Sequence, residues 1–262
     1  MFKQVILLIC ALAVCSGTQA QVKKKIKKGR RNKSESQFML DENYFQAEWE
    51  IGHEIITADV NTTVYPNLLL RYGINKKIEV NAEISFLTAH DELAQSTNTS
   101  GIEPVSFGVN YLLLAETKRS PAIIFSGQLA LPFLASKNFT ANYLAPSLQT
   151  TVEKAMNEKT IIGLSTGVMW DGFITAPAYI YNGMVSYNVT KKWMLTSEWF
   201  GFINGGAPQH NTDLSVTYTL NKSVQFGVTS GIGLSAAAHK SYVGFNGVWG
   251  CCIKGRKKSR VF

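Results

Sequence analysis

Residues 77–87 read KIEVNAEISFL, and this stretch decides the fold class. Apolar side chains occupy every even position from Ile78 to Phe86, and polar side chains occupy the odd positions from Lys77 to Ser85. A period of two is that of a β-strand, whose successive side chains point to opposite faces, and a helix would not segregate these residues. The same alternation recurs over 44–52 and 213–220. The sequence therefore predicts an all-β protein.

The same pattern, followed along the chain, predicts twelve strands. Most are about 9–13 residues long, close to the roughly 9–11 residues with which a tilted strand crosses a bilayer. The predicted strands are 43–53, 62–74, 77–87, 102–114, 121–133, 143–154, 160–170, 178–189, 192–203, 212–220, 223–231 and 241–250.

The connections between these strands alternate in length. Short turns are predicted at 75–77, 115–120, 157–159, 190–191 and 221–222, and longer loops at 54–61, 88–101, 134–142, 171–177, 204–211 and 232–240. Both ends of the strand region then lie on the side of the short turns. An even number of antiparallel strands, with short turns at one end and long loops at the other, is the plan of an up-and-down transmembrane β-barrel of the outer membrane.

Composition excludes several other classes of protein. Hydrophobic residues make up 45% of the 262, which excludes a mainly disordered chain. After residue 20 no apolar run reaches the ~18 residues of a spanning helix, which excludes a multi-span helical membrane protein. The net charge of +8 comes from the chain ends, where residues 22–33 hold eight basic residues and residues 254–262 hold five. Because no basic stripe lies on a folded face, we expect no nucleic-acid partner.

The N-terminus has the features of a secretory signal. Lys3 supplies the positive charge, an apolar run follows from Val5 to Val14, and Thr18–Gln19–Ala20 offers a small-residue cleavage site. We predict a signal peptide over 1–20, a disordered basic segment over 21–42, the barrel over 43–250 and a basic tail over 251–262. After removal of the leader only the adjacent Cys251 and Cys252 remain, so no disulfide framework is expected.

Polar side chains at mid-strand positions are the candidate site. On a membrane barrel they point into the lumen, whereas on a soluble sheet the same residues form the wet outer face. Acidic lining favours cations in a channel. The alternative is that the carboxylates pair with Arg71 and Lys154 and only fill a narrow lumen. The predicted pore-lining residues are Glu48, Glu50, Arg71, Glu79, Asn81, Glu83, Asn110, Gln128, Gln149, Glu153, Asn182 and Glu198.

Catalytic and metal signatures do not support an enzyme. The chain contains no GxSxG, HExxH or P-loop motif. Its four histidines fall in or at the predicted loops without helical ligand spacing. We expect no catalytic residue, no metal and no cofactor.

Several segments resemble a known family. Residues 70–80 (LRYGINKKIEV), 101–113 (GIEPVSFGVNYLL), 129–132 and 187–198 (YNVTKKWMLTSE) are similar to strand and turn signatures of the MetA-pathway-of-phenol-degradation-like outer-membrane proteins, often labelled transporters. Residues 213–235 and 242–249 resemble the family's last strands, so the likeness covers roughly 60–250. Asn110 stands where lysine is common, and the end, with Cys251 and Cys252, departs from the pattern. The resemblance implies an outer-membrane barrel that passes small compounds, with hydrophobic ones among the candidates, and it transfers no site residue.

The sequence thus predicts an exported outer-membrane barrel that acts as a passive channel or transporter for a small solute through a narrow polar lumen. Its partners would be the bilayer and the solute, and the sequence sets no oligomeric state. Two alternatives stay open. One is a structural or adhesive barrel with a plugged lumen that works through its long loops, and the other is a soluble exported binding protein.

Overall fold

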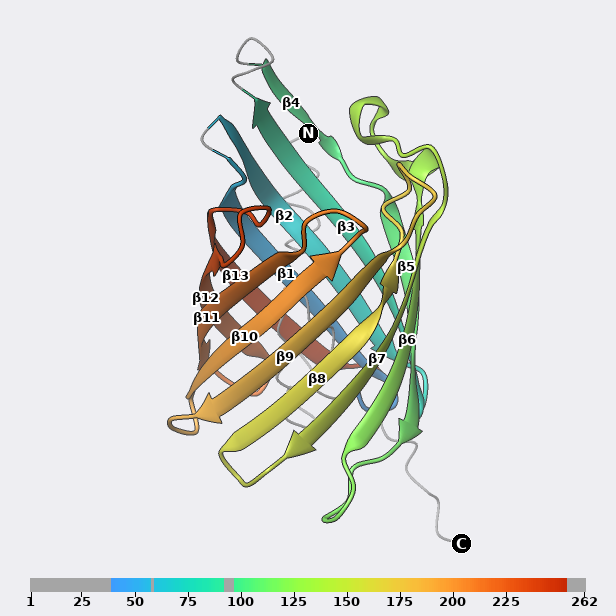
Figure 1. The fold of residues 1–262 in the computed structure, drawn as a ribbon. Helices are drawn as coiled ribbons and strands as arrows, with labels where there is room; N and C mark the ends of the chain where they lie inside the picture. The colour runs from blue at the N-terminus through green and yellow to red at the C-terminus, as the bar shows by residue number, and fades with distance from the viewer. Residues whose placement is uncertain (1–38, 58, 92–96, 254–262) are drawn as a thin grey trace, which may run out of the picture.

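A computed structural model describes residues 39–57, 59–91 and 97–253, and these form one closed antiparallel barrel (Figure 1). The signal peptide over 1–20, most of the basic segment over 21–42 and the tail beyond Ile253 lie outside the described residues. The strands are β1 (Tyr44–Ile55), β2 (Val60–Gly73), β3 (Ile78–Asp91), β4 (Thr97–Ile102), β5 (Val105–Leu114), β6 (Ala122–Leu131), β7 (Ala145–Ala155), β8 (Thr160–Met169), β9 (Ala178–Asn188), β10 (Trp193–Ile203), β11 (Gln209–Thr219), β12 (Val224–Gly233) and β13 (Ser241–Cys252).

Twelve strands make the barrel wall, as predicted. Each strand pairs with its neighbour in sequence, and β1 pairs with β13 to close the sheet. Segments β4 and β5 count as one wall strand because both pair with β3, β4 through Phe86–Ile102 and β5 through Glu83–Ser106. The break between them falls at Pro104, which has no N–H to donate to a ladder.

The predicted extents of two long loops are wrong. Strand β3 continues to Asp91 and pairs with β4 from Thr97, so most of the predicted loop over 88–101 is a raised hairpin. The predicted loop over 54–61 shrinks because β1 runs to Ile55 and β2 begins at Val60. Residues 97–101 (TNTSG) lack the apolar alternation on which the prediction depended. In Figure 1 the wall of β2, β3 and β4 rises above the rim formed by β10–β13.

The short turns are held by side chains of the turn itself. The Oδ1 atoms of Asn75, Asn157 and Asn221 each accept hydrogen bonds from backbone N–H groups two or three residues further on. Such Asx turns supply locally the partners that the backbone needs where a ladder ends. These turns lie at the same end of the barrel as Tyr44 and Cys252, and we call this end the inner end. The long loops lie at the opposite end, which we call the outer end.

Polar side chains face the inside of the barrel and apolar side chains face outward. Glu48, Glu79 and Glu198 are at most 2% exposed, whereas Phe107 and Leu164 on the outer face are 50% and 62% exposed. This is the reverse of a soluble sheet and is the arrangement of a barrel whose outer band contacts lipid. No helix within the described residues is long and apolar enough to cross a membrane.

A charged side chain on the outer face should destabilise the barrel more the closer it lies to the middle of the bilayer. Leu164 lies in the middle of β8, opposite Val152 and Gly183 on the neighbouring strands. We expect Leu164→Arg to cost about 2–4 kcal/mol, because an arginine at the bilayer midplane is poorly solvated. Leu220→Arg, at a short turn, should cost about 0–1 kcal/mol. Unfolding in urea in phospholipid vesicles measures both variants, and equal costs would contradict a lipid-facing β8.

Candidate lumen and outer cavity

An ion-pair cluster fills the lumen near its inner end. Arg71 donates from Nε and Nη2 to both carboxylate oxygens of Glu79, at 2.7 and 3.1 Å, and from Nη1 to Glu48 at 3.1 Å. Gln46 and Asn110 donate to the same two carboxylates at 2.9 and 3.1 Å. These five residues lie on β1, β2, β3 and β5 and are buried. A buried arginine with two hydrogen-bonded carboxylates joins four neighbouring strands of the wall.

Residues 39–41 lie across the inner end of this cluster. Met39 and Leu40 are 5% and 1% exposed, and the Leu40 N–H donates to Glu79 Oε2 at 2.7 Å. Gly73 permits this approach, since a Cβ there would collide with the carbonyl oxygen of Asp41. The chain therefore enters β1 from inside the inner mouth.

The rest of the inner half is also filled. Glu153 and Glu198 are fully buried, and Asn182 donates to Glu198 Oε2 at 3.0 Å. Apolar side chains share this space, with Ile124 and Met194 at 1% and 2% exposure. The lining therefore includes apolar residues beside the predicted polar ones, because several even-numbered positions of β6 and β10 carry apolar residues on the inward face.

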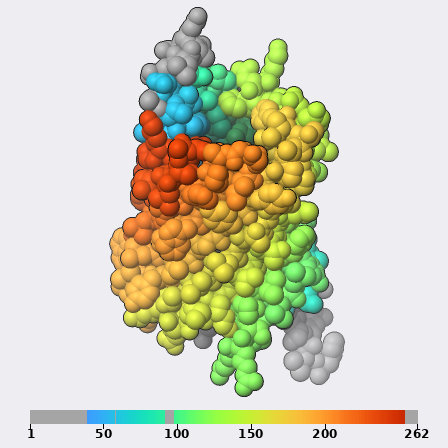
Figure 2. Space-filling model, in the orientation of Figure 1, coloured from blue at the N-terminus to red at the C-terminus, as the bar shows by residue number. Residues whose placement is uncertain are grey.

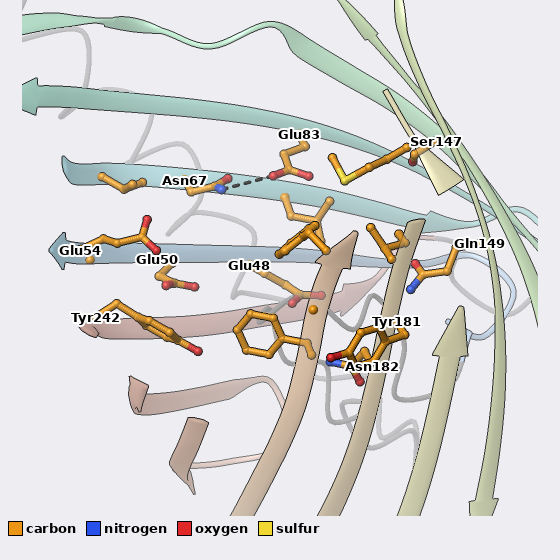
Figure 3. Close-up of a pocket in the computed structure, with 18 of the residues that line it drawn as sticks. Glu48, Glu50, Glu54, Asn67, Glu83, Ser147, Gln149, Tyr181, Asn182 and Tyr242 are labelled. Atoms are coloured by element: carbon orange, nitrogen blue, oxygen red, sulfur yellow. Dashed lines mark hydrogen bonds between the residues drawn. The ribbon is translucent and has the colours of Figure 1, made fainter. Parts of the chain in front are cut away.

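The outer half encloses a cavity of about 420 Å³. Glu48, Glu50 and Glu54 project into it from inward positions of β1, and Asn67 on β2 donates to Glu83 Oε1 on β3 at 3.2 Å (Figure 3). Figure 2 shows that the rim of the barrel is hollowed between the blue-to-teal strands and the orange and gold loops. The cavity lies on the side of the long loops, which is the outer side of such a barrel.

The wall opposite these carboxylates is apolar and aromatic. Ile180 and Tyr181 on β9 and Phe200 and Phe202 on β10 line it, whereas Tyr242 on β13 lies beside Glu54 of the neighbouring strand β1. Tyr242 donates to Asp213 at 2.7 Å, which fixes the ring on the lumen side. A second cavity of about 250 Å³ adjoins the first, with Met169 and Phe202 in both linings. A solute here would meet carboxylates on one side and rings on the other.

The lumen carries a large excess of acidic groups. The described strands contain two lysine or arginine side chains, Arg71 and Lys154, against nine acidic ones, namely Glu48, Glu50, Glu54, Glu79, Glu83, Asp91, Glu153, Glu198 and Asp213. Lys154 lies at the inner rim, 3.7 Å from Glu116 and hydrogen-bonded to turn carbonyls. Such a channel interior attracts cations and repels anions.

The twelve residues predicted to line the pore all point inward, in four groups. Glu48, Arg71, Glu79 and Asn110 belong to the ion-pair cluster. The alternative that lumenal carboxylates pair with Arg71 and Lys154 therefore holds for Arg71, whereas Lys154 pairs with Glu116 at the inner rim. Asn81 and Gln128 lie 3.4 Å apart, beside Gly108, where a Cβ would collide with both side chains. The residues that line the outer cavity are Glu50, Glu83, Gln149 and Asn182, together with Glu48. The last two, Glu153 and Glu198, lie in the filled inner half.

The sequence prediction missed the aromatic wall and the entry of the chain. Phe200 and Phe202 share the inward phase of Glu198 on β10, so extension of the alternation could have found them. The alternation could not have identified Tyr181. This residue lines the cavity near the loop end of β9, although it occupies an outward position in the alternation of that strand. Met39 and Leu40 carry no periodic signal, since they precede the first strand.

The family can now be assigned. The sequence profile of the MetA-pathway of phenol degradation family matches residues 28–249. The chain belongs to this family. None of the curated proteins searched matches it.

Solved structures show the same fold. An outer membrane channel from Pseudomonas putida F1 aligns with a TM-score of 0.65 and 14% identity, covering 81% of this chain and 97% of that one. Two weaker likenesses are a mutant of the monoaromatic hydrocarbon channel TodX (TM-score 0.44, 9% identity, 81% and 90% covered) and the outer membrane phospholipase A of Escherichia coli (0.43, 11%, 78% and 92%). The fold of this family member is that of an outer-membrane β-barrel, with short turns facing the periplasm.

Proposed function

We propose that the protein is a passive outer-membrane channel for a small solute that combines an apolar body with a positively charged group. The cavity of about 420 Å³ carries this proposal, because carboxylates line one side and aromatic rings the other. A cation gains from both walls, through Coulombic attraction and through the ring faces. The cavity is within the usual size range of small-molecule sites. The proposed role is binding and passage, without a covalent step.

Other observations support the same direction. Acidic side chains occupy three inward positions of β1, at Glu48, Glu50 and Glu54, so a cation meets favourable groups at several points along the wall. The P. putida protein with the same fold is described as an outer membrane channel. Passage to the periplasm requires that residues 39–41 and the side chains that fill the inner half of the lumen move aside.

Efflux from proteoliposomes tests this function. Benzyltrimethylammonium and benzenesulfonate share an aromatic body and differ in charge, and neither crosses a bare bilayer readily. We expect protein-dependent efflux of the cation at least about tenfold faster than that of the anion, equivalent to about 1.4 kcal/mol. Equal rates, or no efflux beyond that of empty vesicles, would refute the proposal.

Cavity filling supplies a matched pair of variants. Ser147 lines the cavity, whereas Leu148 beside it points outward and is 45% exposed. Ser147→Trp should slow cation efflux severalfold because the indole occupies the solute's space, and Leu148→Trp should leave it unchanged. If both variants slow efflux equally, the path does not run through this cavity.

A further inference from the structure

The innermost lining residues of the outer cavity form a ring, which we call the cavity floor. On each strand of the floor, the next inward position is buried and lies outside the cavity lining. Glu48 on β1 lies opposite Leu69 on β2, which in turn lies opposite Glu83 on β3. Asn182 on β9 likewise lies opposite Phe200 on β10. The floor consists of Glu48, Leu69, Glu83, Gln149, Asn182 and Phe200.

Glu48 belongs both to the floor and to the ion-pair cluster below it. Its Oε1 atom accepts hydrogen bonds from Gln46 and Arg71, at 2.9 and 3.1 Å, while no described residue donates to its Oε2 atom. The side chain is 2% exposed and projects into the cavity (Figure 3). Arg71 is shared with Glu79, so the three ionised groups of the cluster sum to one negative charge. The floor therefore offers a cation a buried carboxylate with one oxygen that the cluster does not use.

Two amide side chains add further acceptors to the floor. Gln149 on β7 is 7% exposed, and its amide forms no hydrogen bond with any described residue. Asn182 is 4% exposed, and its Nδ2 atom donates to Glu198, but its Oδ1 atom has no partner in the described part of the chain. Figure 3 shows the Gln149 amide pointing into the cavity, across from the carboxylates of β1. Buried amide oxygens are nearly always hydrogen-bonded in proteins, so these two call for an occupant that donates.

Other carboxylates of the cavity already have partners within the wall. Glu83 accepts from Asn67 at 3.2 Å, and Glu54 near the mouth is hydrogen-bonded to His239. Between the floor and the mouth, the side of the cavity that faces β1 is apolar, and it includes Met169, Ile180 and Phe202. The cavity thus combines an acceptor-rich floor with an apolar upper wall.

We propose that the floor binds a primary ammonium group of the solute, an inference that rests on the proposed function and specifies its charged group. A primary ammonium carries three N–H donors and no acceptor. Glu48 Oε2 and the amide oxygens of Gln149 and Asn182 supply acceptors for these donors, and hydrogen bonds between charged partners are the strong ones. A quaternary ammonium brings the charge without a donor, and the aromatic cages that recognise such groups need several rings. The floor contains one ring, that of Phe200, so the geometry favours the primary group, with the apolar body of the solute against the upper wall.

Binding to the folded barrel in detergent micelles tests the inference with three probes that share a benzyl body. Benzylammonium carries charge and N–H donors, benzyltrimethylammonium carries charge alone, and benzyl alcohol carries a donor without charge. We expect the Kd of benzylammonium to be at least about tenfold lower than that of either other probe. Ligand-observed NMR titration measures the three values, with protein-free micelles as the blank. Binding is measured instead of efflux because the neutral form of a primary amine crosses a bilayer unaided. Equal affinities of the two cations would overturn the proposal.

A matched pair of amide variants locates the site. Gln149→Leu removes a floor amide that has no hydrogen bond to a described residue to lose, whereas Gln225→Leu changes a buried lumenal amide outside the cavity lining. We expect Gln149→Leu to weaken benzylammonium binding severalfold and to leave benzyltrimethylammonium binding unchanged, and Gln225→Leu to alter neither. A preference that came only from the smaller size of benzylammonium would survive Gln149→Leu.

Two results with these variants would contradict the floor site. One is a benzylammonium preference that is undiminished in Gln149→Leu, and the other is an equal loss in Gln149→Leu and Gln225→Leu. The shift in gel mobility on boiling shows whether each variant is folded, and the comparison of the three probes on the unchanged protein holds without either variant.

The outcomes also separate this inference from the proposed channel. Selective benzylammonium binding without protein-dependent efflux of benzyltrimethylammonium would refute the channel and leave the floor site standing. Efflux of benzyltrimethylammonium together with equal binding of the two cations would retain the channel and refute the floor site.

Discussion

Arg71→Met should cost the folded barrel about 3–5 kcal/mol, because it leaves Glu48 and Glu79 as buried charges without their shared partner. Both carboxylates are at most 3% exposed, and each depends on the arginine for one or two charge-assisted hydrogen bonds. The unboiled protein keeps a distinct mobility in detergent gels while the barrel is folded. We expect the temperature at which this mobility is lost to fall markedly.

Two further variants separate charge from packing. The triple variant Arg71→Met, Glu48→Gln, Glu79→Gln should recover much of the loss, since removal of all three charges is far less costly than removal of one partner. Lys154→Met should cost about 0–1 kcal/mol, because its pair with Glu116 lies at the rim and is partly solvated. A loss as large for Lys154→Met as for Arg71→Met would show that the cluster does not join the wall strands.

Reversal of two charges in the outer cavity should abolish the preference for cations. At roughly 8 Å and an effective ε of about 40, each unit charge contributes about 1 kcal/mol. We therefore expect Glu50→Lys with Glu83→Lys to lower the cation-to-anion efflux ratio by more than about tenfold. Glu79 is unsuitable for this test because its reversal would also break the pair with Arg71.

A control with the same change in net charge lies outside the lumen. Glu116 and Glu158 are in short turns at the inner rim, and their replacement by lysine should leave the efflux ratio nearly unchanged. If this rim variant shifts the ratio as far as the cavity variant, the selectivity comes from the overall charge of the protein and not from the cavity.

The barrel itself was predictable because polar and apolar residues alternate along its strands. The pattern of 77–87 reappears in the structure, where Glu79 and Asn81 point inward and Ile84 is exposed on the outer face. Turn residues such as Asn75 and Asn221 marked the inner end correctly. The hairpin of β3 and β4 escaped prediction because Thr97–Gly101 pairs through its backbone, without an apolar face to mark it.

The functional roles within the lumen were less predictable. Alternation shows that Glu50 and Glu79 point the same way, but not that Glu79 meets Arg71 from the next strand while Glu50 lines a cavity. That division depends on the register of β1, β2 and β3 and on the entry of Leu40 at the inner end. The aromatic wall depends likewise on strands far apart in the chain, with Phe200 and Tyr242 rings 6.5 Å apart.

Thiol labelling of intact cells tests most directly whether the acidic face surrounds a lumen that opens outward. Glu83 lines the cavity, and Ile84 beside it faces lipid. The chain carries serine at Cys251 and Cys252, so that neither native thiol reacts. A small impermeant thiol reagent added outside should label Glu83→Cys and leave Ile84→Cys unlabelled. Labelling of Ile84→Cys with Glu83→Cys protected would mean that the polar face is not the lumen, and it would contradict both the cavity and the channel.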